Sequence, residues 1–445
     1  MPAPQVLLVS IVLAPGLMFL ALGLGWLLGW TPKEPVIVRS AKLIYGLATV
    51  AVAGLAASMW SAGVHSISAG SGSWYAVRNF EIPMVLSVDR LSLPFTALTV
   101  VLVGLVAIFS QRYLHRDPGF HRFFVLLHLF AFGALLVFTA GSFDLLIGGW
   151  ELICVSSALL VAFFQSRPEP ARSAIRVYIT YRTCDTGLMI GAFVLHHVAG
   201  STLYTTVFNG SWPKQDPALV GASATLIGLL FLLAAMGKSA QVPFSGWMPR
   251  AMEGPTPSSA IFYGAISVHV GAYLLLRAQP LLAASAHASA AVILVGALSA
   301  IHGTMVARVC TDAKTSLAYS SISQLGLIFI EIGFGLSWVA VVHIAGHAIV
   351  RTLQFLKAPS ILHEHHEMHA AAGGHLAKTG AHFEALIPEG MRLWLYRLAL
   401  DRGHHDAILD RFAARSLRRF ALRMTTLEER LTGTHARTGE RGLDG

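Results

Sequence analysis

The stretch GKSAQVPFSGWMPRAMEGPTP, residues 237–257, decides how this chain folds. It places Lys238 at the end of an apolar run that begins near Leu219, and four prolines follow the lysine. A charged group at that depth in a bilayer costs roughly 3 kcal/mol even on lenient insertion scales. Pro243 interrupts the helix about one turn later, and a broken helix is tolerated in a membrane only where protein or water satisfies the freed backbone groups. A buried charge beside a helix break indicates an ion pathway.

The composition is that of a membrane protein with many spans. Of the 445 residues, 55% are hydrophobic and 12% are charged, and the mean hydropathy is +0.63. Apolar runs of about 20 residues recur, each long enough to cross a bilayer. The first run lacks a basic region before it and a small-residue cleavage site after it, so it is predicted to be a span and not a signal peptide. No basic stripe carries interleaved aromatic residues, so nucleic acid is not an expected partner.

We predict an all-α polytopic fold of about 11 transmembrane helices, with a helix broken near Pro243 and a basic, amphipathic helical tail in the cytoplasm. The chain is expected to divide into N-terminal transmembrane helices (1–90), a core that carries the ion pathway (91–360), and a histidine-rich linker with the tail (361–445). The predicted spans are 6–30, 43–62, 93–110, 123–140, 145–164, 177–198, 219–242, 258–276, 290–307, 316–334 and 338–356.

Basic residues are unevenly divided between alternate loops. One set of loops carries only Arg78, Arg90, Lys214 and Arg277. Most of the other loop lysines and arginines lie on the opposite side, and the positive-inside rule places that side in the cytoplasm. The N-terminus is therefore expected outside and the C-terminus in the cytoplasm.

Several predicted spans carry ionisable residues that would suit a proton pathway. A relay needs groups of alternating sign with shifted pKa values, linked by water within the bundle. The alternative for each residue is a structural ion pair or a hydrogen-bonded buried histidine, and this alternative weighs more for single histidines than for Glu151 and Lys238. His343, His347 and Arg351 follow one another at intervals of four and stack on one helix face. The candidates are Glu151, Lys238, His269, Glu331, His343, His347 and Arg351.

Two further patterns have mainly structural interpretations. Arg182 and Asp185 are spaced i and i+3 in the sixth span and are predicted to form a structural ion pair. The cluster HEHHEMH at 363–369 lacks the HExxH spacing of a zinc enzyme, and the three cysteines form no CxxC motif. We therefore expect neither a metal nor a cofactor in this chain.

The tail carries apolar residues at intervals of about three, four and seven between residues 391 and 431, which predicts a basic amphipathic helix broken near Gly403. Such a helix either lies on membrane lipid headgroups or docks on a soluble partner. The candidate docking residues are Arg392, Arg397, Arg411, Arg415 and Arg418.

Four motifs resemble those of the antiporter-like proton-translocating membrane subunits, a group that includes the largest membrane subunit of respiratory complex I and the Mrp antiporters. They are RDPGFHRFFVLLHLFAF, GWE, GKSAQVPFSGWMPRAMEGPTPSS and SLAYSSISQLG, within residues 88–357. The resemblance implies that Glu151 and Lys238 form the ion pair of a proton channel, with His343 and His347 in its hydrophilic axis. This chain departs from that pattern at Tyr263, where a histidine is usual.

The variant SSAIFYGAISVHVGAYLLLR, the exit FLKAPSILHEHHE and the short membrane part look most like the DabB subunit of bacterial inorganic-carbon transporters. That resemblance implies an ion-conducting subunit of the inner membrane that is not itself an enzyme. Its DabA-like partner, a soluble protein resembling a zinc β-carbonic anhydrase, would hold the zinc and convert CO2 to bicarbonate. The alternative function is proton pumping in a respiratory NADH:quinone oxidoreductase or an Mrp-type cation/proton antiporter. A third is a membrane anchor whose channel is inactive.

Overall fold

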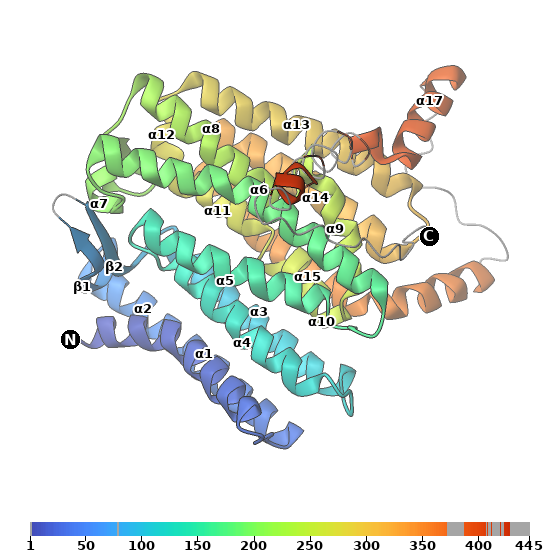
Figure 1. The fold of residues 1–445 in the computed structure, drawn as a ribbon, viewed down its shortest axis with the longest axis horizontal. Coiled ribbons are helices and arrows are strands. Elements are labelled where there is room, and N and C mark those ends of the chain that lie inside the picture. Colours follow the sequence, from blue (N-terminus) through green and yellow to red (C-terminus); the bar gives the residue numbers. More distant parts are fainter. Residues whose placement is uncertain are drawn as a thin grey trace.

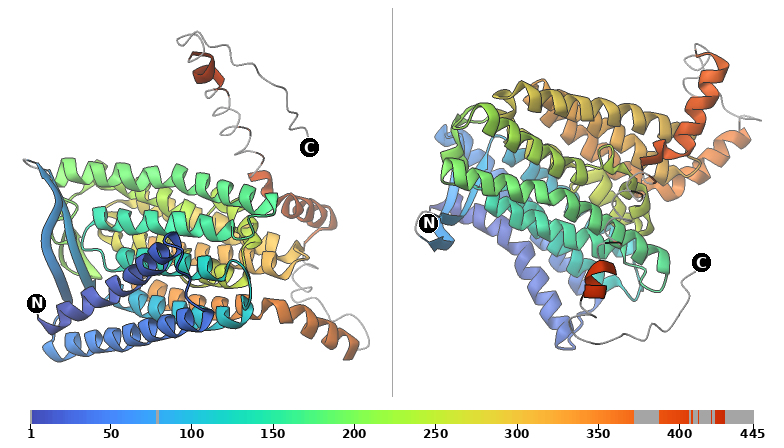
Figure 2. Two further views of the ribbon diagram at one scale, coloured as in Figure 1. Left: turned by 60° about the horizontal axis from the view of Figure 1, so that its bottom comes forward. Right: turned by 45° about the horizontal axis from the view of Figure 1, so that its top comes forward.

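The computed structural model describes residues 2–77, 80–371 and 387–405, together with 407, 411, 419 and 422–427; for residues 71 and 359–371 it describes the backbone alone. Long helices lie side by side along a common direction (Figure 1). Strands lie at the end of this bundle that is next to the N-terminus, and helix α17 (Glu389–Leu400) lies at the opposite end (Figures 1 and 2).

The described part of the chain forms ten long helices and one span that is built from shorter pieces. The long helices are α1 (Ala3–Leu27), α2 (Glu34–Ala62), α3 (Ser92–Tyr113), α4 (Phe120–Phe138), α5 (Phe143–Val161), α6 (Pro168–Ala199), α8 (Gly221–Lys238), α13 (Ala286–Val309), α14 (Ala313–Gly333) and α15 (Ser337–Ala371). The pieces of the remaining span are α10 (Thr256–Ser259), the π-helical η3 (Ala260–Ala265) and α11 (His269–Arg277). Short connecting elements are α7 (Tyr204–Val207), η1 (Phe244–Gly246), α9 (Trp247–Arg250), η2 (Ala251–Glu253), α12 (Gln279–Ala283) and η4 (Arg402–His404).

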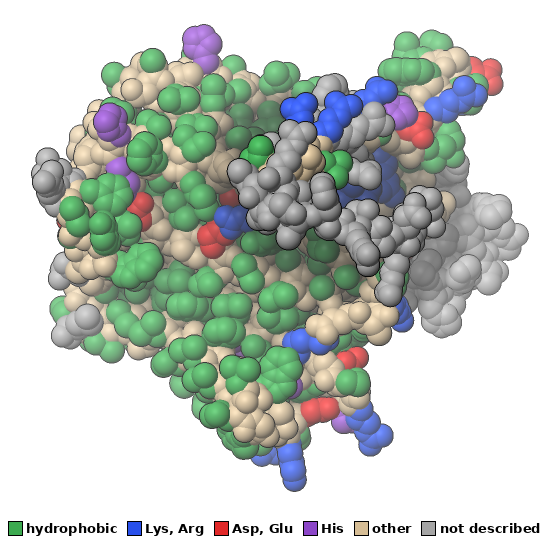
Figure 3. Space-filling view, viewed as in Figure 1, with side chains coloured by type: hydrophobic (Ala, Val, Ile, Leu, Met, Phe, Trp, Pro, Cys, Tyr) green, Lys and Arg blue, Asp and Glu red, His purple; other side chains and the backbone are tan. Residues whose placement is uncertain are grey.

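The prediction of a polytopic, mainly helical membrane protein is confirmed. Ten segments of the described chain are long and apolar enough to cross a membrane, and they correspond to ten of the eleven predicted spans. The remaining predicted span is α6, a helix of 32 residues that packs against α5 and α8 but carries more charge. Large apolar side chains such as Val342 (70% exposed) and Phe193 (69% exposed) cover the outside of the bundle, and the face in Figure 3 is mainly hydrophobic.

Two β-hairpins interrupt the helical pattern, and the sequence analysis did not foresee them. Strands β1 (Ser66–Val77) and β2 (Phe80–Asp89) pair antiparallel between α2 and α3, and β3 (Phe208–Ser211) pairs with β4 (Lys214–Pro217) between α7 and α8. Antiparallel pairing satisfies the backbone groups of these connections without a helix. The Ser87 amide also donates to the Thr139 carbonyl (2.7 Å), and the Gly141 amide donates to the Val85 carbonyl (2.8 Å). The larger hairpin is thereby attached to the start of α5.

The predicted break near Pro243 is present. Helix α8 ends at Lys238, Ala240 has a positive φ of 51°, and the chain resumes with the 3-10 turn η1. Backbone groups freed by the break find partners: the Gln241 amide donates to Met236 O (2.8 Å) and the Val242 amide donates to Ser299 Oγ (3.0 Å). Protein atoms therefore supply the hydrogen bonds that a bilayer would not.

The segment after the break is also irregular, and it forms the centre of the bundle. Residues 256–282 are all buried. A Cβ at Gly264 would lie 2.9 Å from the backbone nitrogen of Thr352, and one at Gly271 would lie 2.6 Å from the Ala235 carbonyl oxygen. These two glycines let the central segment pack directly on the backbones of α15 and α8.

The C-terminal part differs from the prediction in the length of its helices. Helix α15 continues to Ala371, beyond the expected end near residue 356, and its 35 residues span about 52 Å, more than the roughly 30 Å of a bilayer core. The predicted tail helix begins as α17, which packs against α13. It ends at Leu400, and Gly403 adopts a left-handed conformation (φ 65°), so the expected break near Gly403 is present.

The ion pair between Asp89 and Arg277 should make the fold sensitive to acid. Burial alone would raise the pKa of Asp89, but the Arg277 guanidinium (Nη1 to Oδ2 2.5 Å) and hydrogen bonds from Ser92 hold that pKa below its usual range. Asp89→Asn leaves the buried Arg277 uncompensated, which should lower the free energy of unfolding by about 3–5 kcal/mol at neutral pH.

Because the pKa is depressed in the folded state, the contribution of Asp89 is complete above about pH 4 and is lost as pH falls through the folded-state pKa. Thermal unfolding in mild detergent should therefore show a gap between wild type and Asp89→Asn that closes on acidification. Glu81→Gln, at an exposed site in the same strand, serves as the control. A gap that stays constant down to strongly acidic pH would contradict this account.

Candidate functional site

Lys238 is the centre of the candidate site and is fully buried. Its Nζ donates to Cys154 Sγ (2.9 Å) and lies 4.4 Å from the centre of the Tyr181 ring. The Cys154 thiol in turn donates to Asp185 Oδ2 (3.3 Å), and Trp150 Nε1 donates to Asp185 Oδ1 (2.5 Å). We call these five residues, which come from α5, α6 and α8, the lysine cluster. A thiol therefore lies between the buried ammonium and the buried carboxylate.

Arg182 and Glu151 form a separate ion pair beside the lysine cluster. The guanidinium of Arg182 donates to both oxygens of Glu151, with Nη2 3.0 Å from Oε1. Their side chains are 33% and 24% exposed, whereas Asp185 is 1% exposed.

This geometry corrects two expectations from the sequence. Arg182 pairs with Glu151 across two helices and not with Asp185 on its own helix. Lys238 bonds to a thiol, so Glu151 and Lys238 are neighbours in the same region and not a direct ion pair. The spacing along α6 predicted Arg182 and Asp185 as partners. Arg182 instead binds Glu151 of α5, and the sequence does not show that α5 and α6 are neighbours at this point.

Close packing at two glycines surrounds Lys238, which is 0% exposed. A Cβ at Gly237 would lie 2.3 Å from the Cβ of Cys184, so α6 contacts α8 directly beside the lysine. Gly271 makes a similar contact from α11, where an added Cβ would lie 2.4 Å from Ser239 Oγ. An ammonium held in such a space interacts with its neighbours far more strongly than one in water.

Three aromatic rings connect the lysine cluster with the central segment. The ring centres of Tyr181 and Trp247 are 4.8 Å apart, and those of Trp247 and Tyr263 are 5.8 Å apart. Trp247 Nε1 donates to the Gly237 carbonyl (2.9 Å), which fixes the ring against the end of α8. Tyr263, the position where the sequence departs from the pattern of the family it resembles, ends this row inside η3.

A pair of buried histidines forms the second part of the site. His269 Nδ1 donates to the Ala265 carbonyl (2.8 Å), because a carbonyl can only accept. In a neutral ring the Nε2 atom of His269 then accepts from His347 Nδ1 (2.8 Å). Among the described residues, His347 Nε2 has no hydrogen-bond partner. The structure therefore joins α11 to α15 through two of the predicted residues.

Of the remaining predicted residues on α14 and α15, His343 and Glu331 are bonded to each other and Arg351 is bonded separately. His343 Nδ1 donates to Glu331 Oε1 (2.8 Å), and His343 Nε2 is 3.0 Å from Gln324 Oε1. Arg351 Nη1 donates to Gln354 on its own helix (2.9 Å). The sequence identified His343 and Glu331 but gave no reason to join them.

Cys154, Trp150 and Tyr181 are functional candidates that the sequence analysis did not name. The available signal was local: Trp150 and Cys154 flank Glu151 on α5, and Cys154 is three residues after Glu151. Glu151, Cys154 and Asp185 have possible ligand atoms within 4.8 Å of one another. Each already bonds to a cation or a donor in the cluster, so the arrangement is a hydrogen-bonded network and not an open metal site.

The predicted docking residues are only partly within the described chain. Arg392 and Arg397 are exposed on α17, and Arg411 is also exposed. Arg415 and Arg418 lie outside the described residues, as do the side chains of the histidine cluster at 363–369.

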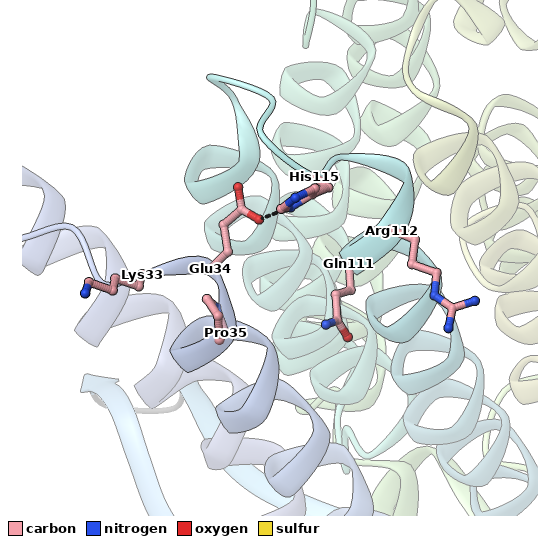
Figure 4. Close-up of a pocket in the computed structure, with 6 residues that line it drawn as sticks. All are labelled: Lys33, Glu34, Pro35, Gln111, Arg112 and His115. Atoms are coloured by element: carbon pink, nitrogen blue, oxygen red, sulfur yellow. Dashed lines mark hydrogen bonds and ion pairs between the residues drawn. The ribbon is translucent and has the colours of Figure 1, made fainter.

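A surface cavity of about 630 Å³ lies between the start of α2 and the end of α3, away from the lysine cluster (Figure 4). His115 Nδ1 and Glu34 Oε2 are 2.8 Å apart at its edge, and Lys33 and Arg112 line it. All four belong to loops or helix ends predicted to face the cytoplasm. Basic groups at this level are suited to anionic lipid headgroups.

Comparison with known proteins places this architecture in a class of membrane-complex subunits. The family described as NADH:quinone oxidoreductase/Mrp antiporter, transmembrane, matches residues 140–387, and the family described as NADH-ubiquinone oxidoreductase (complex I), chain 5 N-terminus, matches residues 74–124. The chain belongs to the NADH:quinone oxidoreductase/Mrp antiporter family of transmembrane subunits.

Individual relatives agree with this assignment. NADH-quinone oxidoreductase subunit L of Mycobacterium tuberculosis is 36% identical over 297 residues, which are 66% of this chain and 46% of the relative. NADH-ubiquinone oxidoreductase chain 5 of Neurospora crassa is 34% identical over 329 residues, 73% of this chain and 45% of the relative. The Mrp complex of a Dietzia species aligns with a TM-score of 0.65 and 28% identity, covering 79% of this chain and 37% of its own. The chain thus spans less than half the length of these relatives.

Replacing Cys154 should expose its role as the partner of Lys238. Cys154→Ala leaves the buried ammonium without its acceptor and should cost about 1–3 kcal/mol of stability, whereas Cys154→Ser, which can still accept and donate, should recover most of it. Cys184→Ala, which removes the buried thiol packed on Gly237, is the matched control. Thermal unfolding of the purified variants measures the difference. Equal losses for Cys154→Ala and Cys154→Ser would show that the thiol acts by packing alone.

Proposed function

We propose that this chain is an ion-translocating, antiporter-like membrane subunit that works within a larger membrane complex and moves protons through the lysine cluster and the buried histidines. The observation that carries the proposal is the complete burial of Lys238 beside a helix break, with a thiol and a carboxylate aligned behind it. An ammonium in this position is expensive to maintain. Its retention favours a transport role over an inert membrane anchor.

The lysine cluster offers a balanced route for one proton. The Lys238 ammonium gives a proton to Cys154 Sγ while the thiol gives its own proton to Asp185. The products are a neutral amine, an unchanged thiol and a protonated carboxylic acid. Loss of both charges removes the attraction between α8 and α6, so the protonation state is coupled to the packing of two helices that meet at Gly237.

The histidines extend the route toward α15. A proton that arrives at His347 Nε2 allows Nδ1 to pass its proton to His269, since Nδ1 already faces the acceptor nitrogen of that ring. His343 and Glu331 lie one turn further along and would exchange protons with water. Glu151 is held by Arg182, so in this proposal the pairing that changes is that of Lys238 with Asp185 and not that of Glu151 with Lys238.

The relatives favour a respiratory or Mrp-type complex as the setting. Their names describe a subunit of NADH-quinone oxidoreductase and an Mrp complex, and in both settings the subunit would be a transporter part and not the enzyme. We propose a location in a cytoplasmic membrane, with the N-terminus outside and α17 on the cytoplasmic side, and the uneven division of loop lysines and arginines supports this orientation.

Inorganic-carbon uptake is a second candidate, favoured by the amphipathic α17. This helix exposes Leu393 (50%), Trp394 (61%) and Tyr396 (51%) beside exposed Arg392 and Arg397. Such a surface suits a soluble partner, and a DabA-like zinc protein is the partner that the sequence resemblance implies. In that complex the zinc and the conversion of CO2 would belong to the partner.

Loss of the titratable amine should stop ion flow. Lys238→Met keeps the volume without charge, and Lys238→Arg keeps the charge without a proton that can leave at physiological pH. Both should reduce proton flux into vesicles by roughly 100-fold, the scale of a lost proton-transfer group. Flux is measured with a pH-sensitive dye in proteoliposomes that contain the protein with the subunits that copurify with it.

Lys214→Met, at an exposed lysine of β4, is the matched control and should leave flux unchanged. Repeating the measurement with Na+ replaced by choline tests whether a cation exchanges for the proton. Full flux in Lys238→Met would remove Lys238 from the pathway and with it the proposed function.

Purification from the native membrane should distinguish the two settings. A tag at the N-terminus leaves α17 accessible, and mild detergent retains bound subunits. Recovery of other NADH:quinone oxidoreductase or Mrp subunits is the expected result. A roughly stoichiometric soluble zinc protein similar to carbonic anhydrase would instead establish the inorganic-carbon setting and contradict the respiratory one.

A further inference from the structure

We propose that the C-terminal segment Glu389–His405 closes the cytoplasmic end of the ion pathway, and that His302 and His405 pass protons between the broken helix and the cytoplasm. The inference deepens the proposed function and rests on it for the direction of ion flow. It assigns a site to two histidines that the lysine cluster and the buried histidine pair do not use.

The segment contacts the membrane helices through the side of α17 that carries Leu395, Leu398 and Ala399, opposite its exposed apolar residues. Helix α17 packs against α13, and Ala399 at their contact is 4% exposed. Two cavities of about 300 and 470 Å³ lie along this contact, and Met305 of α13 and Ala399 of α17 line both. Val242, which belongs to the helix break, lines the smaller cavity together with His302, Gly403 and His405. The tail and the break therefore line one shared surface cavity.

His302 connects this space to the break. Its Nε2 is 3.5 Å from Ser245 Oγ in η1, two residues after Pro243. Its ring lies 4.5 Å from the ring of His405, centre to centre, and 5.8 Å from that of Tyr319. The chain between Lys238 and Ser245 has side chains that continue the polar route: Gln241 Nε2 donates to the Ser239 carbonyl (2.8 Å). Two buried polar side chains, Ser239 and Gln241, thus lie on the stretch of chain that leads from Lys238 to Ser245 and His302.

The turn after α17 brings His405 to this position. Gly403 has a φ of 65°, and a Cβ there would lie 3.1 Å from His405 Cε1 and 3.5 Å from His302 Nδ1. The neighbouring His404 is mostly exposed, and its Nε2 is 3.7 Å from Asp401. Two adjacent histidines therefore have different surroundings: one faces the break and the other faces solvent.

Imidazoles suit the exit of a proton pathway because each ring carries a donor and an acceptor nitrogen and changes charge near physiological pH. A ring pair between the break and solvent can receive a proton on one nitrogen and release one from the other, with no net change in the ring. Because His405 follows α17 in the tail, a soluble partner bound to α17 would also affect the last proton-transfer step.

A cross-linking experiment tests the docking of the segment independently of transport. Met305→Cys and Ala399→Cys, combined in a Cys310→Ser background, should be joined by a short bis-maleimide in native vesicles. Leu294→Cys with Ala399→Cys is the control, because Leu294 is about 16 Å further along α13 and 60% exposed. Absence of the first cross-link would overturn the inference whether or not the protein conducts protons.

Flux in proteoliposomes tests the role of the histidines. His405→Ala and His302→Ala should each lower flux by about tenfold or more, and the double variant should be no worse than either, because the two rings act in series. Added imidazole should restore part of the flux in His405→Ala, which a merely structural role would not produce. His404→Asn, with a residue that tolerates the left-handed backbone, is the matched control.

The outcomes separate this inference from the proposed function. If Lys238→Met loses proton flux and His405→Ala keeps full flux, the proposed function stands and the proposed proton exit at His405 is wrong. Loss in His405→Ala without rescue by imidazole would assign the ring a packing role and also overturn it. Loss with rescue, together with the Met305–Ala399 cross-link, would establish the exit.

Discussion

Lys238 is buried completely, and the free energy needed to remove its charge from water must be offset by the groups around it. A thiol, two aromatic rings and a carboxylate behind the thiol provide that compensation from two other helices, α5 and α6. The same requirement explains the close backbone contacts at Gly237 and Gly271, since any gap there would admit water or leave the charge without neighbours. The break after Lys238 is stabilised in the same way, by side chains and carbonyl groups of adjacent helices. Residues of α5, α6 and α11 thus all pack around the end of α8 that carries this one ammonium group.

The order in which the polar groups follow one another affects proton transfer as much as their burial does. A direct ion pair between lysine and carboxylate would be strong and would hold its proton in one place. A thiol between them lengthens the route, weakens the attraction and allows either end to be neutralised. The aromatic row from Tyr181 to Tyr263 then separates the lysine cluster from the histidines of α11 and α15. The site therefore consists of two polar groups divided by packed aromatic rings, and a proton passes from one to the other only when these rings move and admit water.

Sequence reasoning located the helices because each span is a long apolar run, and it located the break because Lys238 and Pro243 violate the helical pattern at adjacent turns. It did not find the hairpins, whose strands lie between spans, where hydropathy carries little information. Among site residues, it named the costly ones, such as Glu151, Lys238 and His347. It mispaired Arg182 because helix spacing reports neighbours along one helix, whereas Glu151 approaches from another. Cys154 was overlooked because a buried thiol is usually inert, and only its contact with Lys238 gives it a role.

The hairpin β1–β2 has a mechanical consequence. It is bonded to the chain at Thr139 and Gly141, and its last residue, Asp89, holds Arg277 at the end of α11, whose Tyr273 hydroxyl donates to the Phe138 carbonyl (2.9 Å). Helices α3, α4, α5 and α11 are therefore fastened together at this end. The opposite end carries the overhanging part of α15 and the helix α17. Any relative movement of these four helices is therefore pivoted at the hairpin and grows toward their opposite ends.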